Sequence, residues 1–316
     1  MTGDLVIGLS AVIVAADSAG PKVLATRGRD GNPALPFGAF DPVEHRTFEL
    51  GLRGWVSEQT GFDLGYVEQL YTFGDKGRET PDARLADAAE TTRVISVSYL
   101  ALTPEPGEID GAFDARWRGW YTFFPWEDHR SGRPAIIDEA IAPGLVSWAA
   151  GHSGRLDRVN VAFGLGSNQS WVEERVLERY ELLYEAGLVT ECARDAGLPL
   201  PGRDLGSPMS SDHRRILATA MGRLRGKVKY RPVVFELMPE RFTLSALQQV
   251  VEALLGLGLH KQNFRRALEK TGLVEGTGAM ETSTGGRPAE LFRFKREMVR
   301  RKEVSGVSTP TTRRDA

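Results

Sequence analysis

The chain has 316 residues, of which 41% are hydrophobic and 26% are charged. This composition is ordinary for a globular protein and excludes a disordered, collagenous or coiled-coil chain. The length suggests two domains, or three short ones. No apolar stretch reaches 18 residues, so we expect no membrane span. The single cysteine, Cys192, excludes a disulfide framework and a cysteine-based zinc site, and a reducing cytoplasm is the expected location.

The net charge of −2 hides an uneven distribution. Residues 213–316 carry 21 Lys and Arg against 10 Asp and Glu, a net charge of +11. Residues 1–212 carry 19 basic against 32 acidic residues, a net charge of −13. Such asymmetry suggests a polyanionic partner for the basic part, above all nucleic acid. The alternative is a solvated basic face without a partner.

The first 150 residues predict an α/β unit. Strands are expected at residues 5–15, 22–25, 66–73, 93–102 and 116–124, from their apolar, β-branched and aromatic content. A helix is expected over 45–60, ended by Gly61, which is a common residue after a helix. The turn-rich segment 28–38 lies before it. The polar segment 76–92 is predicted to be a surface insertion.

The middle of the chain predicts a long helix and then a linker. In residues 168–186, Trp171, Tyr180 and Tyr184 recur with aliphatic residues at helical spacing. We interpret this aromatic stripe as core or dimer packing. Proline and glycine punctuate residues 199–208, which predicts a linker where the net charge changes sign.

The basic part predicts a winged helix-turn-helix. Helices are expected at residues 213–225, 244–255 and 259–270, and strands at 232–237, 273–274 and 291–294. Thr243 or Ser245 is expected to cap the second helix, and Gly272 to end the third. The order helix, strand, helix, turn, helix and two-stranded hairpin is that of a winged helix.

The third of these helices carries residue types that read DNA. Its apolar residues can pack inward, which leaves a polar face of Lys261, Gln262, Asn263, Arg265 and Arg266. Arginine can bind guanine bidentately, and glutamine or asparagine can do the same with adenine. Arg287, in the hairpin loop, is placed for a phosphate contact. A second basic run, residues 223–231, precedes the first strand. The alternative for the third helix is an ordinary solvated face.

Residues 34–61 resemble a Nudix box with a defective middle. That box reads Gly, five residues, Glu, seven residues, then Arg-Glu-hydrophobic-x-Glu-Glu-x-Gly. Gly38 and Glu44 have the right spacing, and Glu58 fits when the end is aligned on its last glycine. Two further positions depart, because Trp55 and Gln59 stand where the box has glutamates. Three glutamates hold Mg²⁺ in such enzymes. We therefore expect no metal and no hydrolysis, but a nucleotide cleft that persists.

Residues 229–244, 261–266 and 286–292 resemble the C-terminal domain of the Nudix-related transcriptional regulators of NAD biosynthesis, the NrtR type. The long middle helix resembles the alphaproteobacterial NadQ variant. The resemblance implies an α/β fold, an N-terminal Nudix-like α/β/α sandwich with a C-terminal winged helix-turn-helix domain. Its parts are a Nudix-like effector domain at 1–150, a helical connector and linker at 151–212, a winged domain at 213–300 and a disordered tail at 301–316.

The resemblance also implies a function. Family members are dimeric repressors that bind double-stranded DNA at NAD biosynthesis operons and release it when ADP-ribose or a related nucleotide binds. No cofactor is expected beyond this effector. Carried over by position, the effector site draws on Arg27, Arg78 and Arg93 for phosphates, Tyr71 and Phe73 for adenine or ribose, and the box residues Glu44 and Glu58. A structural ion pair is an equal alternative for each arginine.

Two other functions stay open from the sequence. One is an active Nudix hydrolase that acts on ADP-ribose or NAD and carries an accessory DNA-binding domain. The other is a nucleic-acid-binding or interaction module without a small ligand.

Overall fold

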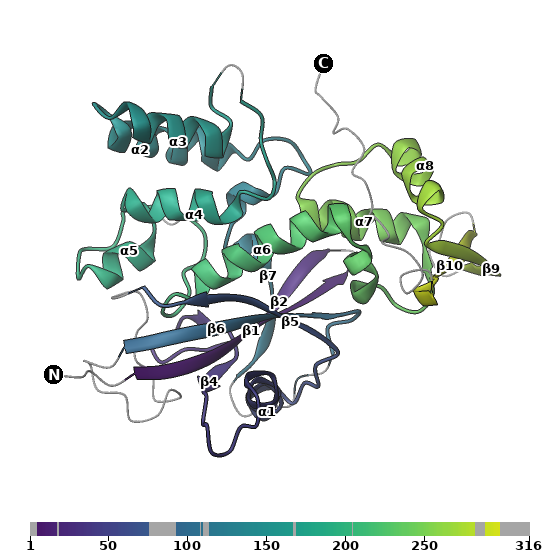
Figure 1. The fold of residues 1–316 in the computed structure, drawn as a ribbon. Helices are drawn as coiled ribbons and strands as arrows, with labels where there is room; N and C mark the ends of the chain where they lie inside the picture. The colour runs from purple at the N-terminus through teal and green to yellow at the C-terminus, as the bar shows by residue number, and fades with distance from the viewer. Residues whose placement is uncertain are drawn as a thin grey trace.

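A computed structural model defines the fold (Figure 1). It describes residues 5–17, 19–75, 93–107, 109, 114–166, 169–203, 205–281 and 288–297. The predicted surface insertion at 76–92 and the predicted disordered tail at 301–316 lie outside these residues.

The first half of the chain builds one mixed sheet. Its strands are β1 (Leu5–Asp17), β2 (Gly20–Arg27), β3 (Pro33–Ala34), β4 (Phe37–Ala39), β5 (Tyr66–Phe73), β6 (Arg93–Thr103) and β7 (Arg116–Gly119). The order is β3-β2-β1-β6-β5, with β4 paired to β1 and β7 paired to β2. The central strands β1 and β6 are parallel and buried on both faces, which explains their nearly continuous apolar sequences. Four of the five predicted strands are thereby confirmed.

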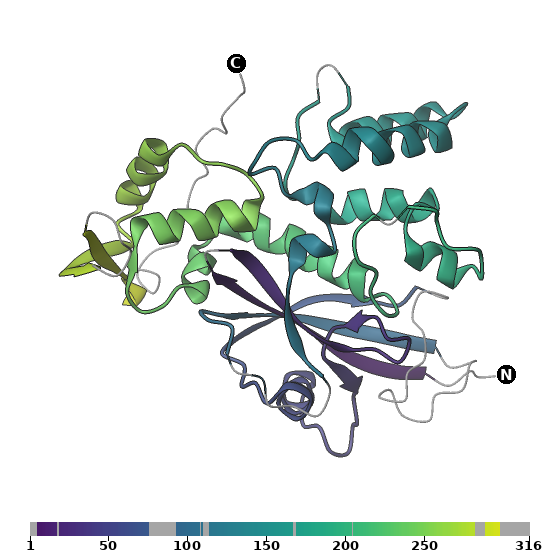
Figure 2. The ribbon, with the colours of Figure 1, turned by 180° about the vertical axis from the view of Figure 1, so that it is seen from behind.

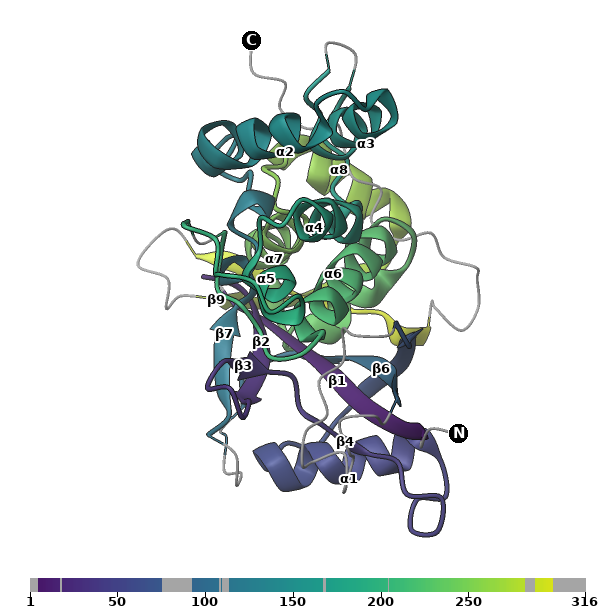
Figure 3. The same cartoon turned by 90° about the vertical axis from the view of Figure 1, so that its left-hand side faces the viewer.

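One helix covers each face of this sheet (Figure 3). On one face lies α1 (Phe48–Thr60), which packs Leu52 and Val56 against the strands. The Thr47 side chain caps its first turn, so the helix begins three residues later than predicted. On the other face lies α6 (His213–Tyr230), whose contacts reach β1 and β5.

A block of helices lies over α6. It consists of the π-helical turn η4 (Ile137–Ile141) and the helices α2 (Ala142–Ala149), α3 (Ser153–Phe163), α4 (Val176–Glu185) and α5 (Thr190–Asp195). α4 packs on α6, and the α2–α3 pair stacks above α4, as Figures 2 and 3 show. Helix α8 (Lys261–Thr271) and the wing, which is the hairpin of β9 (Val274–Glu281) and β10 (Ala289–Phe294), lie toward the end of α6 that is away from α5 (Figures 1 and 2).

The predicted helix at 168–186 is shorter than expected. Of its described residues, only those of α4, from Val176, are α-helical, and the segment before α4 instead contacts the guanidinium group of Arg179. This group donates to Val172 O at 2.9 Å, and its Cζ lies 3.8 Å from the centre of the Trp171 ring. Tyr180 is fully buried, which confirms core packing for that part of the aromatic stripe.

Two further predictions fail for one physical reason. The strand predicted at 116–124 ends at Gly119, and the 3₁₀ turns η2 (Trp120–Thr122) and η3 (Pro125–Glu127) follow it. The strand predicted at 232–237 is a 3₁₀ helix, η5 (Pro232–Leu237). Nearly all apolar side chains of these segments are buried, whereas a strand points alternate side chains to opposite faces. Compact turns direct neighbouring side chains into one core.

The C-terminal elements form the predicted winged helix. They are the helices α7 (Leu244–Leu255) and α8 (Lys261–Thr271) and the strands β8 (Phe242–Thr243), β9 (Val274–Glu281) and β10 (Ala289–Phe294). The strand order is β8-β10-β9. The Thr243 side chain accepts from the Ala246 N–H at 3.1 Å, as one of the two predicted caps requires.

The sheet and the winged helix share one hydrophobic core. Leu100 of β6, Leu224 of α6 and Leu254 of α7 belong to one continuous buried cluster. The predicted boundary at residue 212 therefore does not separate two cores, because α6 closes the sandwich and supports α7 at once. The predicted linker is also packed, since Leu205 and Met209 within or beside it are buried. Among the described residues, no helix has the length and apolar character needed to cross a membrane.

Candidate nucleic-acid interface

The predicted recognition helix, α8, is amphipathic in the expected sense. Phe264 and Leu268 are fully buried and fix the helix to the core. The predicted DNA-binding residues of this helix are exposed or half-buried: Lys261, Gln262, Asn263, Arg265 and Arg266. None of these five side chains has a hydrogen bond or ion pair with any residue that the structure describes. They are therefore available to a partner.

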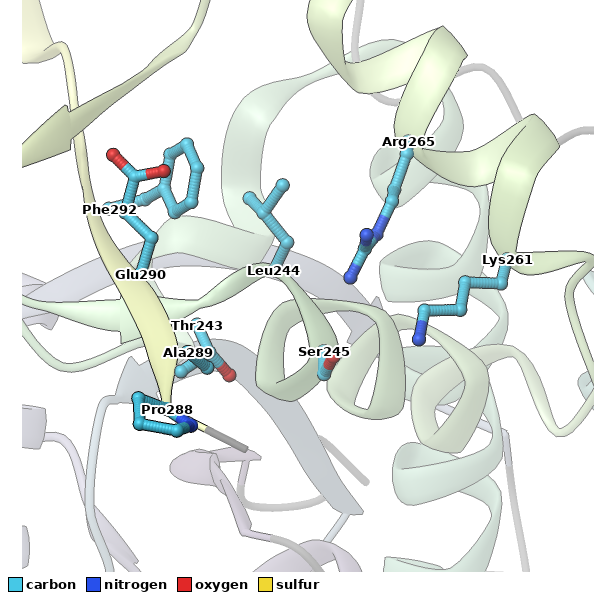
Figure 4. A pocket seen from close by; sticks show the side chains of 9 residues that line it. All are labelled: Thr243, Leu244, Ser245, Lys261, Arg265, Pro288, Ala289, Glu290 and Phe292. Carbon is cyan, nitrogen blue, oxygen red and sulfur yellow. The ribbon is translucent and has the colours of Figure 1, made fainter. Parts of the chain in front are cut away.

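A groove runs between α8, the start of α7 and the wing (Figure 4). Its volume is about 490 Å³, and it is lined by Thr243, Leu244, Ser245, Lys261, Arg265, Pro288, Ala289, Glu290 and Phe292. Figure 4 shows Lys261 and Arg265 reaching from α8 toward Ser245 in the first turn of α7. Since first-turn N–H groups lack intrahelical acceptors, this side of the groove is electropositive. Glu290 is the carboxylate in its lining.

The groove includes residues that sequence reasoning missed as candidates. Ser245 and Glu290 lie far from α8 in the chain and were not assigned a role in binding. For Ser245, the available signal is its place beside a helix cap. For Glu290, the sequence contains no signal, because its place depends on the register of the hairpin. Arg287, the predicted phosphate contact of the wing, lies outside the described residues.

The second basic run, at 223–231, is not a free cationic surface. Arg225 is fully buried and contacts the carboxylate of Glu127, with 2.5 Å between Arg225 Nη1 and Glu127 Oε2. Lys227 pairs with Glu68 of β5. Lys229 pairs with two glutamates just before α4. These three cations pair with carboxylates of the acidic residues 1–212. The expectation that the run adds to a nucleic-acid surface is therefore wrong for them.

Burial and charge together set the ionisation of this inner cluster. Burial alone would raise the pKa of Glu127, but the charges of Arg179 and Arg225 outweigh burial and hold the pKa below its usual value. The Arg179 guanidinium donates to both oxygens of Glu127, at 2.6 and 2.9 Å. Nearby, burial lowers the pKa of His129 to about 4, so its imidazole is neutral at pH 7.

The aromatic residues predicted for an effector site lie on β5. Phe73 is only 2% exposed, and the Arg215 guanidinium of α6 stands 5.3 Å from its ring centre. Tyr71 packs edge-on against Phe73 at 5.1 Å and is 56% exposed. Phe73 thus belongs to the core beneath α6, while Tyr71 faces outward.

The charged residues predicted for that site are exposed and spread over several elements. Arg27 ends β2, and Arg93 begins β6, where it donates to a main-chain carbonyl at 2.7 Å. Glu44 precedes α1 and Glu58 lies on it. Arg78 lies outside the described residues. The effector assignment of all seven residues stays a prediction.

Two altered positions of the Nudix-like box now hold α1 to β4. The Trp55 indole donates to Ala39 O at 2.8 Å and lies so close to Gly38 that a Cβ there would be 2.3 Å from the ring. Buried Gln59 accepts from the Phe37 N–H at 3.2 Å and donates to Phe37 O at 2.6 Å. Among the described residues, no group of three or more His, Cys, Asp or Glu side chains could hold a metal ion.

Comparison with known proteins agrees with this architecture. Residues 234–294 match the family model of the NrtR DNA-binding winged helix domain. The ADPR responsive transcriptional repressor NtrR of Acinetobacter baylyi is 41% identical over 86 residues, which is 27% of this chain and 34% of that protein. The match thus spans about a third of this curated relative's length.

The likeness to solved structures extends over nearly all of the chain. Shewanella oneidensis NrtR is similar with a TM-score of 0.55 at 22% identity, covering 96% of this chain and 99% of that one. The same protein in complex with a 27mer DNA has a TM-score of 0.54 at 20% identity, with the same coverage. A MutT/nudix family protein from Enterococcus faecalis has a TM-score of 0.52 at 17% identity, covering 93% and 88%.

These findings define the class of the protein first. It is a Nudix-fold protein with a C-terminal winged helix domain. Within this class, the matched winged helix domain and the end-to-end similarity give the chain the architecture of the NrtR-type, Nudix-related regulators.

Proposed function

We propose that the protein is a DNA-binding transcriptional repressor of NAD biosynthesis genes, controlled by ADP-ribose or a related nucleotide in a catalytically inactive Nudix domain. The observation that carries the proposal is the outer face of α8, where Lys261 and Arg265 have no partner among the residues that the structure describes and border an electropositive groove. The match of residues 234–294 to a DNA-binding winged helix domain supports the same function. The name of the Acinetobacter baylyi relative supports ADP-ribose as the effector. We place the protein in the cytoplasm.

A repressor of this design works as a homodimer on a palindromic operator. Two copies of α8 then enter successive major grooves about one helical turn apart. The effector releases DNA only if it binds the DNA-incompetent arrangement more tightly. A coupling free energy of about 1–3 kcal/mol is sufficient for release by about 5–150-fold.

The enzyme alternative is disfavoured by Trp55 and Gln59. Both side chains are engaged with the main chain of the β4 segment, where a hydrolase of this kind needs carboxylates. Incubation of the protein with Mg²⁺ and ADP-ribose, followed by chromatography, tests this point. We expect no turnover, and Mg²⁺-dependent formation of AMP would establish the hydrolase instead.

The principal test is fluorescence anisotropy at about 150 mM salt. The probes are promoter fragments of NAD biosynthesis genes and of the neighbouring genes, with scrambled fragments as the control. We expect at least about 1,000-fold preference for one promoter, as is usual for specific binding, and reversal on titration of ADP-ribose. Equal affinity for scrambled DNA overturns the proposal. Specific binding that no NAD-related nucleotide reverses leaves a DNA-binding module without that effector.

A further inference from the structure

The C-terminal end of α7 is held by groups that lie outside the matched winged helix domain. The last carbonyl groups of a helix accept no hydrogen bond from within the helix, so they need donors from elsewhere. Three carbonyl oxygens here have such donors: Ala253 O accepts from the Tyr121 hydroxyl at 2.6 Å, Leu254 O from Arg225 Nε at 2.9 Å, and Gly256 O from the His129 N–H at 2.7 Å. Tyr121 and His129 belong to the segment that follows β7, and Arg225 belongs to α6.

Two of these donors are locked in place by the buried ion cluster. The Arg225 guanidinium, fully buried, contacts the Glu127 carboxylate and donates to Glu127 O at 3.1 Å. The same guanidinium lies 3.3 Å from the Tyr121 hydroxyl oxygen, which accepts from it while donating to α7. Neither donor can move without breaking a charge-assisted hydrogen bond of this cluster.

The C-terminal end of α7 is closely packed against the segment that follows β7. Gly256 ends α7 with φ of 70°, which favours glycine. A Cβ at this position would lie 2.2 Å from Glu127 O and 2.9 Å from the Tyr121 hydroxyl oxygen. The helix end therefore sits directly on the turn that follows β7.

A second set of hydrogen bonds carries this placement on to α8. The Glu252 carboxylate of α7 accepts from the Leu259 N–H at 2.8 Å and from Gln248 Nε2 at 2.9 Å. Gln248 Nε2 also donates to Leu259 O at 3.2 Å. The segment that leads into α8 is thus fixed on α7 from both its N–H and its carbonyl.

The chain of contacts begins at the sheet. Tyr121 follows β7, which pairs with β2 next to the central strand β1. A displacement of β7 therefore moves the hydroxyl group that holds α7, and α7 holds α8.

We infer that Tyr121 and Arg225 are positioning residues for DNA recognition, which fix α8 through the C-terminal carbonyl groups of α7. The inference rests on the proposed function for its effect on DNA, but not for its effect on α8. In this arrangement the winged helix is not a freely hinged module. A nucleotide that displaces β7 reaches the recognition helix through these two side chains.

The experiment uses the full-length Tyr121→Phe variant, which removes one hydroxyl group and little volume. Hydrogen exchange of the α7 C-terminus and α8 is measured by mass spectrometry, and operator affinity by anisotropy. We expect exchange there to accelerate by about two- to tenfold, as for one lost hydrogen bond. We expect operator affinity to fall by a similar factor while affinity for scrambled DNA stays the same.

Tyr184→Phe is the matched control, because the Tyr184 hydroxyl bonds to Asp195 at 2.9 Å far from α7. It should match the wild type in both measurements. Glu252→Ala is the second variant and should accelerate exchange in α8 without changing the bond between Tyr121 and α7. Unchanged exchange and affinity in Tyr121→Phe, or equal changes in Tyr184→Phe, overturn the inference. If the wild type has no operator preference, the proposed function fails, and the exchange data still decide whether Tyr121 holds α8.

Discussion

Helices α6 and α8 are both rich in arginine and lysine, but they use these residues in opposite ways. On α6, Arg214 and Arg225 are fully buried against glutamates from other elements. On α8, Lys261 and Arg265 have no partner among the described residues and border an open groove. The comparison teaches that a positive charge in the sequence is a candidate contact to DNA only where the fold leaves it without an internal carboxylate.

The free energy of unfolding should distinguish substitutions on the two helices most clearly. Arg225→Met removes a fully buried cation from Glu127 and should lower the free energy of unfolding by about 3–5 kcal/mol, because part of the buried negative charge loses its partner. Lys261→Met, on exposed α8, should change it by no more than about 0.5 kcal/mol. Urea denaturation followed by circular dichroism measures both values. Similar losses in the two variants would contradict the division.

Substitutions on α8 should affect DNA affinity far more than they affect stability. Arg265→Ala is expected to weaken operator binding by about 5–150-fold, the equivalent of about 1–3 kcal/mol for one base contact, with unchanged unfolding. Arg116→Ala, on β7, is the control for loss of one positive charge, since this arginine is exposed and its partner Asp114 is on the surface. The control should bind as the wild type does. Anisotropy titrations at fixed salt decide, and equal losses in both variants would indicate a general charge effect.

The pH dependence of stability should report on the buried cluster beside α6. His129 has a pKa of about 4 because it is buried, whereas in the unfolded chain the value is close to 6.5. The unfolded chain therefore takes up the proton first as the pH falls, and stability declines through the window from 6.5 to 4. Between pH 7 and pH 5 the loss should be about 2 kcal/mol.

His129→Phe should lack this part of the loss, since phenylalanine does not titrate. Its ring can still stack on Trp171, which lies 4.0 Å from the imidazole centre. Denaturation at both pH values gives the comparison. Glu127, whose pKa is lowered by two arginines, adds a further loss that begins as the pH falls to the ordinary carboxyl pKa and continues below it. An identical pH profile in wild type and variant would exclude His129 as the cause.

The smallest expected difference is between two neighbouring residues of α1, the buried Gln59 and the exposed Glu58. Gln59→Glu replaces the donor to Phe37 O by an acceptor, so it should cost about 1–3 kcal/mol of unfolding free energy. Glu58→Gln changes an exposed neighbour and should stay within about 0.5 kcal/mol. Thermal or urea unfolding measures both. Equal stability of the two variants would show that the altered box position does not hold α1 to β4.

Local sequence patterns are sufficient to predict an element whose structure depends on its own residues alone. Thr243 and Gly256 mark the ends of α7, and the buried run of β6 forms the predicted strand. The amphipathic pattern of α8 correctly separated Phe264 and Leu268 from the polar face. These features depend on backbone caps and side-chain periodicity, which a short stretch of sequence contains in full.

Signals failed where distant segments compete for the same side chains. The aromatic run after β7 has a strand-like composition, but its burial on one side requires turns. Helix α6 was assigned to the winged domain, because nothing local shows that Glu68, Glu127 and Glu173 lie against it.

The sequence by itself determined the helices of the winged helix and which side of α8 faces outward. Only the tertiary structure decided which cations remain available, because ion pairing depends on carboxylates up to about 160 positions away in the chain, as between Lys227 and Glu68. It also decided that the sheet, α6 and α7 share one core. Burial of apolar surface is a property of surfaces brought together, and no single segment encodes its partner.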